Sequence, residues 1–391
     1  MRPLRPMAAI LLGVALLMPA GAMGVAPAAA RKSKAAAEAY ANGQVKEAIG
    51  LYTEAIEVDP NYAEAYYQRS ALYRELGRWD DELEDLKSAL TCDRKHQGAL
   101  RRRADIYFYS QKYLDAELDY TALIKLDRRP WYAYVMRGRA RVAQGHDDSA
   151  FKDFDKAIEE APWAWQALYE RGRIYARLGK TKRAERDFED ALEQYPQHAG
   201  THVELGKLRF AEKKLDEALK LFTNAERLSH GEGGEALYWR GNTYRALQDW
   251  DNAAADYADA LEQGFDTAEL RYNRAAVAYE LGELEQARDD LKLAIERDPQ
   301  NERYRWAFGR VEELLARRRA EKDMREAEAE AQRLAEEEAK RQAEEDAAAE
   351  KDNDDAGDNG DVADDGGDDD EGDDEGDDDD EDVGDDFIKP F

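Results

Sequence analysis

Residues 165–198 read WQALYERGRIYARLGKTKRAERDFEDALEQYPQH, and their pattern recurs along the chain at a spacing of 34 residues. Most copies carry Arg followed by a small residue, then a Gly, then Ala with a large apolar residue four positions later. The copies, numbered repeats 1 to 8, begin near residues 29, 63, 97, 131, 165, 199, 234 and 268. A one-residue insertion precedes repeat 7, in the glycine-rich stretch 230–234. A fixed period of this length is typical of helical repeats that stack to bury their apolar faces.

Small and large residues occupy fixed positions in each repeat. Position 8 is small, as at Gly172, and position 20 is small, as at Ala184. Position 24 is large and apolar, as at Phe188. Gly179 marks the end of the first helix, where a left-handed residue is useful, and Pro196 marks the end of the second. We therefore expect two helices per repeat, which cross closely where the small residues lie.

This pattern resembles the tetratricopeptide repeat (TPR) family over residues 29–301. The resemblance implies an all-α fold of about eight antiparallel helix pairs, stacked into a right-handed superhelical solenoid with a concave face. The expected repeats span 29–62, 63–96, 97–130, 131–164, 165–198, 199–233, 234–267 and 268–301. Glu82 stands where position 20 should be small, and Gln111 replaces the glycine between the helices of repeat 3.

Two polar positions vary together. Position 7 is Arg and position 23 is Asp in the same six repeats, whereas repeat 6 has Leu205 and Leu221. A half-buried Arg without its carboxylate is costly, so we expect ion pairs between two helices, within a repeat or between neighbours. The predicted structural pairs are Arg69 and Asp85, Arg103 and Asp119, Arg137 and Asp153, Arg171 and Asp187, Arg240 and Asp256, and Arg274 and Asp290.

The resemblance also implies where a partner would bind. In TPR proteins, positions 2, 5, 9, 12 and 13 of each first helix face the concave groove. In this chain those positions are rich in aromatic residues, with basic residues in repeats 4 to 6, and such side chains are common anchors of protein interfaces. The predicted groove residues are Tyr67, Phe108, Tyr109, Arg139, Tyr169, Arg173, Arg177, Lys207, Phe210, Tyr238, Asn242, Arg245, Tyr272 and Tyr279.

Some TPR proteins clamp the C-termini of chaperones through five conserved places in three successive repeats. Asn242, Asn273 and Arg303 match three of those places, whereas Tyr238 and Ala307 do not match the other two. We therefore expect a different ligand, with a carboxylate-ended peptide as the remaining alternative.

The chain after residue 301 changes character. Residues 302–350 lack Pro and carry no Gly after Gly309, which predicts a helix whose start caps the last repeat and whose remainder is a charged stalk. A coiled coil is the alternative. Residues 351–391 hold 22 of the 88 acidic residues and predict a disordered Asp-rich tail with an apolar C-terminus, a candidate docking peptide. We expect this tail to be able to fold back over the basic groove and compete with partners.

The N-terminus has the three parts of a secretory signal. Arg2 and Arg5 are followed by an apolar run over residues 7–18, and small residues precede Arg31. This predicts a signal peptide over residues 1–30, with an uncleaved membrane anchor as the alternative. The expected location is extracytoplasmic, in the periplasm or secreted.

No arrangement of residues predicts catalysis, a cofactor or a metal site, since nucleotide-binding loops, HExxH and cysteine pairs are all missing. A net charge of −31 disfavours nucleic acid as a partner. We expect a non-enzymatic, exported scaffold that binds peptides or proteins in its concave groove, without stable membrane insertion after signal cleavage. The alternative is a cation-binding or mineral-associated structural protein acting through the acidic tail.

Overall fold

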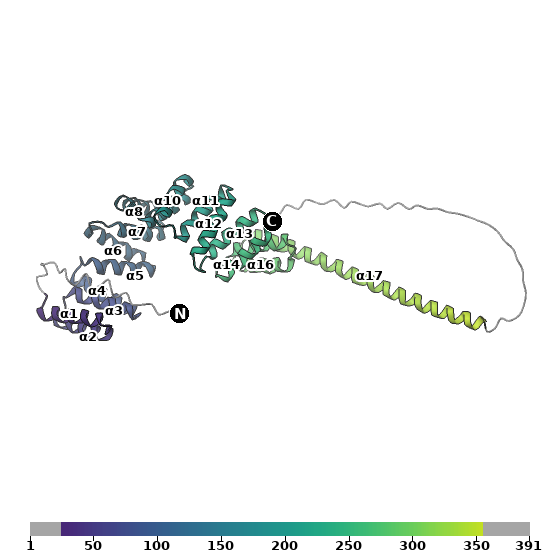
Figure 1. Ribbon diagram of the computed structural model, residues 1–391, viewed down its shortest axis with the longest axis horizontal. Helices are drawn as coiled ribbons and strands as arrows, with labels where there is room; N and C mark the ends of the chain where they lie inside the picture. Colours follow the sequence, from purple (N-terminus) through teal and green to yellow (C-terminus); the bar gives the residue numbers. More distant parts are fainter. Residues whose placement is uncertain (1–24, 355–391) are drawn as a thin grey trace, which may run out of the picture. The chain divides into compact units, whose positions relative to one another are not determined.

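The computed structural model describes residues 25–354, with side chains up to residue 346, and all regular structure in this range is α-helical. The helices form two compact units that divide between His230 and Gly231, inside the predicted insertion. Figure 1 labels the helices in chain order. The first unit contains α1 (Pro27–Ala41), α2 (Val45–Val58), α3 (Ala63–Glu75), α4 (Trp79–Cys92), α5 (Gln97–Tyr109), α6 (Tyr113–Leu126), α7 (Trp131–Ala143), α8 (Asp147–Glu160), α9 (Trp165–Arg177), α10 (Thr181–Gln194), α11 (Ala199–Ala211) and α12 (Leu215–Leu228). The second contains α13 (Gly234–Ala246), α14 (Trp250–Glu262), α15 (Ala268–Glu280), α16 (Leu284–Arg297) and α17 (Glu302–Asp354).

Each repeat is one helix pair, and the pairs stack within each unit. In the first unit α1 packs on α2 within repeat 1, and α2 then packs on α3 of repeat 2. The same alternation continues to α12, and in the second unit it runs from α13 to α17. The predicted all-α solenoid of helix pairs is therefore confirmed for each unit.

A left-handed residue ends the first helix of every repeat. Five of the eight positions are glycine, including Gly179 with φ 68°. Gln111, Lys213 and Gln248 take the same conformation with φ 60° at the other three. The turn therefore persists in repeat 3 despite the missing glycine, at the strain that a side chain in this backbone region carries.

Close helix crossings explain the small residues at position 8. A Cβ atom added to Gly172 would lie 2.6 Å from Cε1 of Phe188, the position 24 side chain of the same repeat. Gly138 meets Phe154 in the same way, and Gly206 meets Phe222. These phenylalanines are fully buried, so small residue and ring form one packing unit.

Glu82, the departure at position 20 of repeat 2, is fully buried. Arg102 from α5 of the next repeat donates to it from Nε at 2.6 Å and from Nη2 at 3.2 Å. A buried carboxylate requires such a partner. Repeat 2 thus replaces a small apolar contact with an ion pair between neighbouring repeats.

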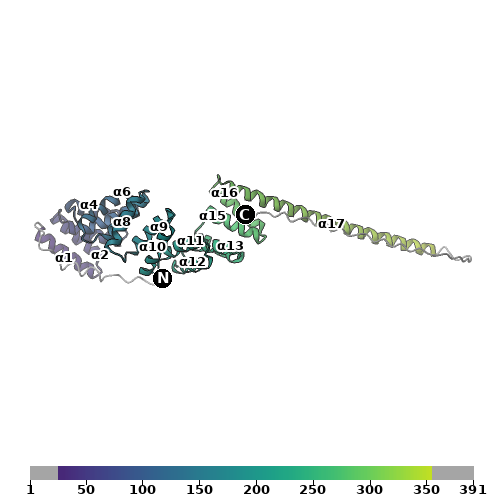
Figure 2. The ribbon, with the colours of Figure 1, turned by 90° about the horizontal axis from the view of Figure 1, so that it is seen from above.

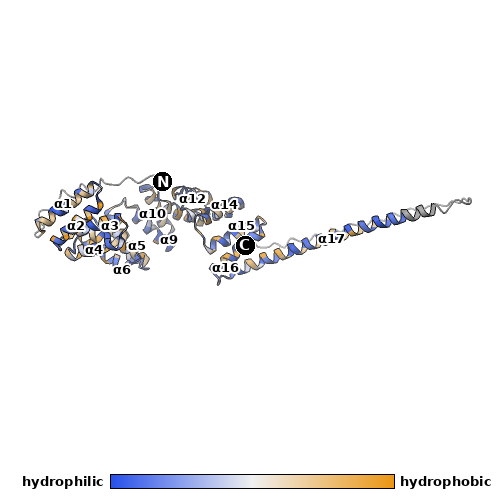
Figure 3. Cartoon of the chain, turned by 90° about the horizontal axis from the view of Figure 1, so that it is seen from below, coloured by the Kyte–Doolittle hydropathy of each residue, from blue (hydrophilic) through white to orange (hydrophobic). Residues whose placement is uncertain are grey.

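The long helix α17 begins as a cap and continues as an exposed rod. Tyr304, Ala307, Val311 and Leu315 are buried against the last helix pair. Figure 2 shows α17 continuing well beyond α15 and α16, and Figure 3 shows that hydrophilic residues dominate that extension. The side chains of residues 316–346 are all exposed. A helical cap followed by a charged stalk is therefore what residues 302–346 form.

Several sequence-based expectations concern the chain ends. Most of the predicted signal peptide (residues 1–24) and nearly all of the predicted disordered tail, with its cation-binding and groove-competing roles, lie outside the described residues. Residues 25–30, the end of the predicted signal, lie inside them and contribute to α1. Among residues 25–354, no helix combines the length and the apolar content needed to cross a bilayer.

Candidate functional site

All six predicted Arg–Asp pairs are present, and each lies within one repeat. The arginine on the first helix contacts both oxygens of the aspartate that follows 16 residues later on the second helix. In repeat 3, Arg103 donates from Nε and Nη2 to Asp119, each at 2.8 Å. The other five pairs have N···O distances of 2.6–2.9 Å. This bidentate geometry is the strong form of a charge-assisted hydrogen bond.

Some of these arginines also reach the preceding repeat. Arg171 donates from Nη1 to Asp155 at 2.8 Å, and Arg69 and Arg137 donate in the same way to Thr53 and Thr121. The sequence left open whether the pairs act within or between repeats. The bidentate contact joins the two helices of one repeat, whereas the third nitrogen joins neighbouring repeats.

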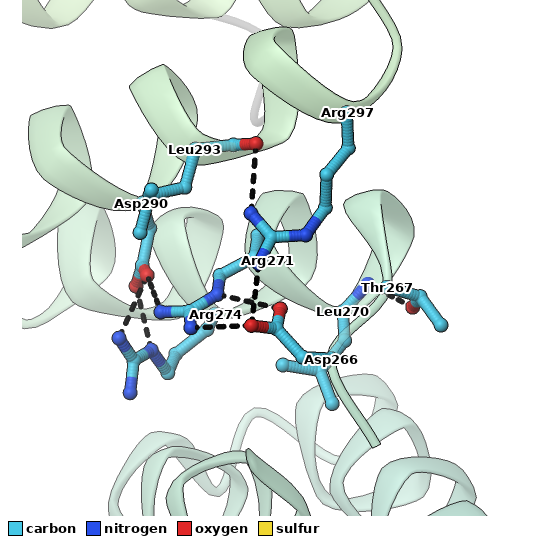
Figure 4. Close-up of polar contacts among 8 residues, drawn as sticks. All are labelled: Asp266, Thr267, Leu270, Arg271, Arg274, Asp290, Leu293 and Arg297. Atoms are coloured by element: carbon cyan, nitrogen blue, oxygen red, sulfur yellow. Dashed lines mark hydrogen bonds and ion pairs between the residues drawn. The ribbon is translucent and has the colours of Figure 1, made fainter. Parts of the chain in front are cut away.

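The last pair belongs to a larger ionic cluster in the second unit (Figure 4). Asp290 accepts from Arg274 at 2.6 and 2.7 Å and from Nη1 of Arg271 at 2.9 Å. Arg271 also donates twice to Asp266 at 2.9 Å, and Arg297 donates to Asp266 as well. The hydrogen bonds from Arg271 lower the pKa of Asp266, and nearby Arg297 and Arg274 add to this effect.

Repeat 6 lacks the pair and packs its two leucines instead. Leu205 is 5% exposed and joins a core with Ala184 and Phe188, against which Leu221 packs. Repeat 6 therefore has leucine in place of both the arginine and the aspartate, and apolar packing replaces the ion pair. This points to a structural role for the Arg–Asp pairs.

Four predicted groove residues come together around a carboxylate that the sequence analysis did not single out. Glu170 on α9 is 8% exposed, and it lies 3.2 Å from Nε of Arg139 and 3.2 Å from Nη1 of Arg173. Arg139 lies over the ring of Phe108 at 5.0 Å, and Arg173 lies over Tyr169 at 5.6 Å. These five residues, from three successive repeats of the first unit, are called the arginine–aromatic cluster.

The remaining basic groove residues of the first unit also have acidic neighbours. Arg177 lies 2.8 Å from Asp147, and Lys207 lies 3.1 Å from Glu204. The predicted basic centre is therefore largely neutralised by local carboxylates. The two arginines of the arginine–aromatic cluster share Glu170, and Glu204 on α11 adds a second negative charge near Arg173.

The aromatic groove residues of the first unit differ in exposure. Tyr109 is 72% exposed and packs edge-on against Phe108, with ring centroids 5.5 Å apart. Tyr67 is partly buried and lies against His96, with centroids 4.7 Å apart. Phe210 is partly buried on α11. Tyr109 thus extends the accessible surface beside the arginine–aromatic cluster.

The groove residues predicted in the second unit are mostly interior. Tyr238, Asn242 and Tyr272 are 9%, 5% and 1% exposed, and Tyr279 packs partly buried against the last helix pair. Asn242 Oδ1 accepts from Tyr257 at 2.7 Å and from Asn273 at 3.0 Å. The Nε atom of Arg245 is also buried. These side chains pack in the interior of the second unit and stabilise its helices. A role in partner contact stays a prediction for them.

The residue at position 24 affects which residues reach this surface. In two of the three repeats where position 24 is Tyr, repeats 3 and 7, its hydroxyl donates to an acidic or amide residue at position 9: Tyr120 to Asp105 at 2.7 Å, and Tyr257 to Asn242 at 2.7 Å. In repeat 1, Tyr52 is paired with Ala37 at position 9, which offers no acceptor. Where position 24 is Phe, as in repeats 4 to 6, position 9 is Arg139, Arg173 or Lys207. Phenylalanine has no hydroxyl to hold position 9, so that position is basic in three successive repeats.

Among residues with described side chains, no group of three or more His, Cys, Asp or Glu is placed to hold a metal ion. The candidate site itself presents a pair of guanidinium groups beside aromatic rings.

Comparison with protein families matches the tetratricopeptide repeat description over residues 101–164, 135–199, 169–232, 201–266 and 238–302, together more than half of the chain. A second description, TPR repeat, matches residues 38–77.

Curated relatives match over short segments. The chain is 30% identical over 104 residues to DnaJ homolog subfamily C member 7 of Homo sapiens, which is 26% of this chain and 21% of that protein. It is 30% identical over 109 residues to RNA polymerase II-associated protein 3 of Mus musculus, which is 28% of this chain and 16% of that protein. The chain thus matches about a fifth or less of the length of each.

Solved structures show the same fold. A chain of the APC/C hetero-tetramer Cut9-Hcn1 aligns with a TM-score of 0.54 and 16% identity, covering 72% of this chain and 56% of that one. PilF of Pseudomonas aeruginosa aligns with a TM-score of 0.50 and 13% identity, covering 56% and 97%. At this identity the likeness concerns the fold alone.

Proposed function

The chain belongs to the tetratricopeptide repeat family, and from this premise we propose that it is an exported, non-enzymatic scaffold that binds a peptide or protein partner at the arginine–aromatic cluster. The partner contacts the first helices of repeats 3 to 5, which form the concave groove by resemblance to the family. The observation that carries the proposal is Glu170, one buried carboxylate held between two arginines from neighbouring repeats.

Glu170 fixes both guanidinium groups without using all of their donors. The side chains of Arg139 and Arg173 remain 37% and 47% exposed, so part of each stays accessible to solvent. Each also lies over an aromatic ring, which limits its rotamers and lowers the entropy lost on binding. Fixed arginines beside aromatic rings are typical energetic centres of protein interfaces.

The guanidinium groups of the cluster favour a partner that supplies a carboxylate. Both remain partly exposed beside Glu170 and Glu204, and a carboxylate accepts bidentate hydrogen bonds from guanidinium. An acidic side chain or a chain end on an extended segment meets this requirement. The Asp-rich residues 351–391 of this same chain supply acidic side chains of this kind, and competition by them would weaken with added salt.

The test is capture of partners from an envelope or secreted fraction. Arg139→Ala with Arg173→Ala is compared with Lys182→Ala and Arg186→Ala, which remove the same charge from exposed positions of α10. We expect a partner held by the wild type and the control pair to be lost by the cluster pair, with helix content unchanged by circular dichroism. Equal capture by all three proteins would refute the site.

Two further arms test the rest of the proposal. Deletion of residues 351–391 should raise partner affinity at low salt if the tail competes, and unchanged affinity would exclude that role. Fractionation of cells expressing the full chain tests export, because a protein found only in the cytoplasm would contradict it.

A further inference from the structure

The first turn of α1 is part of the folded repeat. Ala29 is fully buried in the core of repeat 1, together with Ala36 and Ala39 further along the same helix face. Pro27 lies in the first turn, a position that suits its fixed φ and its missing N–H. Residues 27–30 therefore form the first turn of α1, and Ala29 also packs into the core of repeat 1.

The residues just ahead of α1 are also tied to the repeat. The N–H of Ala26 donates to Oδ2 of Asp59 at 3.1 Å, and Asp59 is the residue that follows α2. Val25 and Ala26 pack partly buried against the repeat 1 core. Val25 and Ala26 thus belong to the folded repeat, and a carboxylate that follows the second helix holds Ala26 in place.

Cleavage after Ala30 would place positive charge at the wrong end of a helix. The shortened α1 would begin with a new α-ammonium group, Arg31, Lys32 and Lys34, and no acidic residue. A helix N-terminus carries partial positive charge and disfavours cations within its first turn. In the full α1 the first turn is uncharged, and the three basic side chains lie further along the helix.

Sequence upstream of Val25 offers an alternative cleavage site. Signal peptidases require a small residue at the last position of the signal and another two positions before it. Ala20-Gly21-Ala22 and Ala22-Met23-Gly24 both meet this requirement, directly after the apolar run. These five residues lie outside the described range.

We propose that a signal peptidase cuts this chain after Ala22 or Gly24, so that the mature protein keeps residues 25–30 as the start of its first repeat. Hydrolysis of the peptide bond consumes one water and leaves a carboxylate on the signal and an amine on the mature chain. With cleavage after Gly24, that amine lies one residue from the N–H that binds Asp59, where a carboxylate can compensate its charge. This inference rests on the proposed export.

The test is the N-terminal sequence and intact mass of the exported full-length protein. We expect a mature chain that begins at Met23 or Val25. A chain that begins at Arg31 would overturn the inference and leave export standing. A protein that retains Met1 in the cytoplasm would overturn export, and with it the inference, so the two failures differ.

Paired variants separate the two cleavage positions. Ala22→Tyr places a large residue in both upstream sites and should cause the full-length precursor to accumulate. Ala30→Gln blocks only the downstream site, and it should give the same mature N-terminus as the wild type. Normal processing of Ala22→Tyr with loss of processing in Ala30→Gln would contradict the proposal.

Discussion

The Arg103–Asp119 pair allows a quantitative test of the ionic contacts between helices. Asp119 has a side chain 9% exposed, and Arg103 has one 21% exposed. Arg103→Leu leaves a buried carboxylate without a partner. The cost should be about 3–5 kcal/mol, because removing one partner of a buried ion pair leaves an uncompensated buried charge. Asp119→Leu should cost less, since the arginine retains some contact with water.

The double variant is the critical arm. Repeat 6 shows that two leucines fit these positions, with Leu205 5% exposed. Arg103→Leu with Asp119→Leu should therefore lie within about 1 kcal/mol of the wild type, as observed when buried ion pairs are replaced by apolar residues. The two single effects should thus be strongly non-additive.

Urea unfolding measures these differences, and hydrogen exchange in α5 and α6 locates them, because a repeat array need not unfold in one step. The reasoning fails if the double variant loses as much as the two single variants together, or if each single variant costs less than about 1 kcal/mol.

Three further predictions address other contacts. Arg271 lowers the pKa of Asp266, so the contribution of Asp266 to stability is present above the ordinary pKa of aspartate and is lost as the pH falls through the lowered value. The stability of Asp266→Asn should therefore depend less steeply on pH in that range. An unchanged acid-unfolding profile would contradict the assignment. Arg102→Met should destabilise the chain by about 3–5 kcal/mol, since it strands the buried Glu82, whereas Arg102→Met with Glu82→Ala should recover most of that loss in urea titrations. Gly172→Ala should destabilise the protein by about 1–3 kcal/mol, because the added methyl group overpacks against Phe188. Gly50→Ala has open space around its Cβ position in α2 and should stabilise the protein by about 0.5–1 kcal/mol. Equal thermal midpoints for the two variants would show that the helix crossing tolerates a methyl group.

The helical repeat and its internal packing could be predicted from the amino-acid sequence. Contacts within one helix pair fall at a fixed separation, so the need for a small residue at Gly172 beside Phe188 recurs in each copy. The Arg–Asp pairs could be predicted for the same reason, because the two residues are 16 positions apart in each copy and are present or absent together. The helix after residue 301 was also predictable, because residues 302–350 contain no Pro and no Gly after Gly309.

The way in which neighbouring repeats use the same surface could be seen only once the helices were packed together. The sequence shows Arg139 and Arg173 as basic residues on first helices, but stacking places Glu170 between them and removes much of their charge. It also places Asn242 and Tyr272 inside the second unit rather than on an open face. Contacts within a repeat follow from helix periodicity, whereas contacts between repeats depend on the offset at which one pair stacks on the next. That offset is set by the summed packing of many side chains, and no single repeat encodes it.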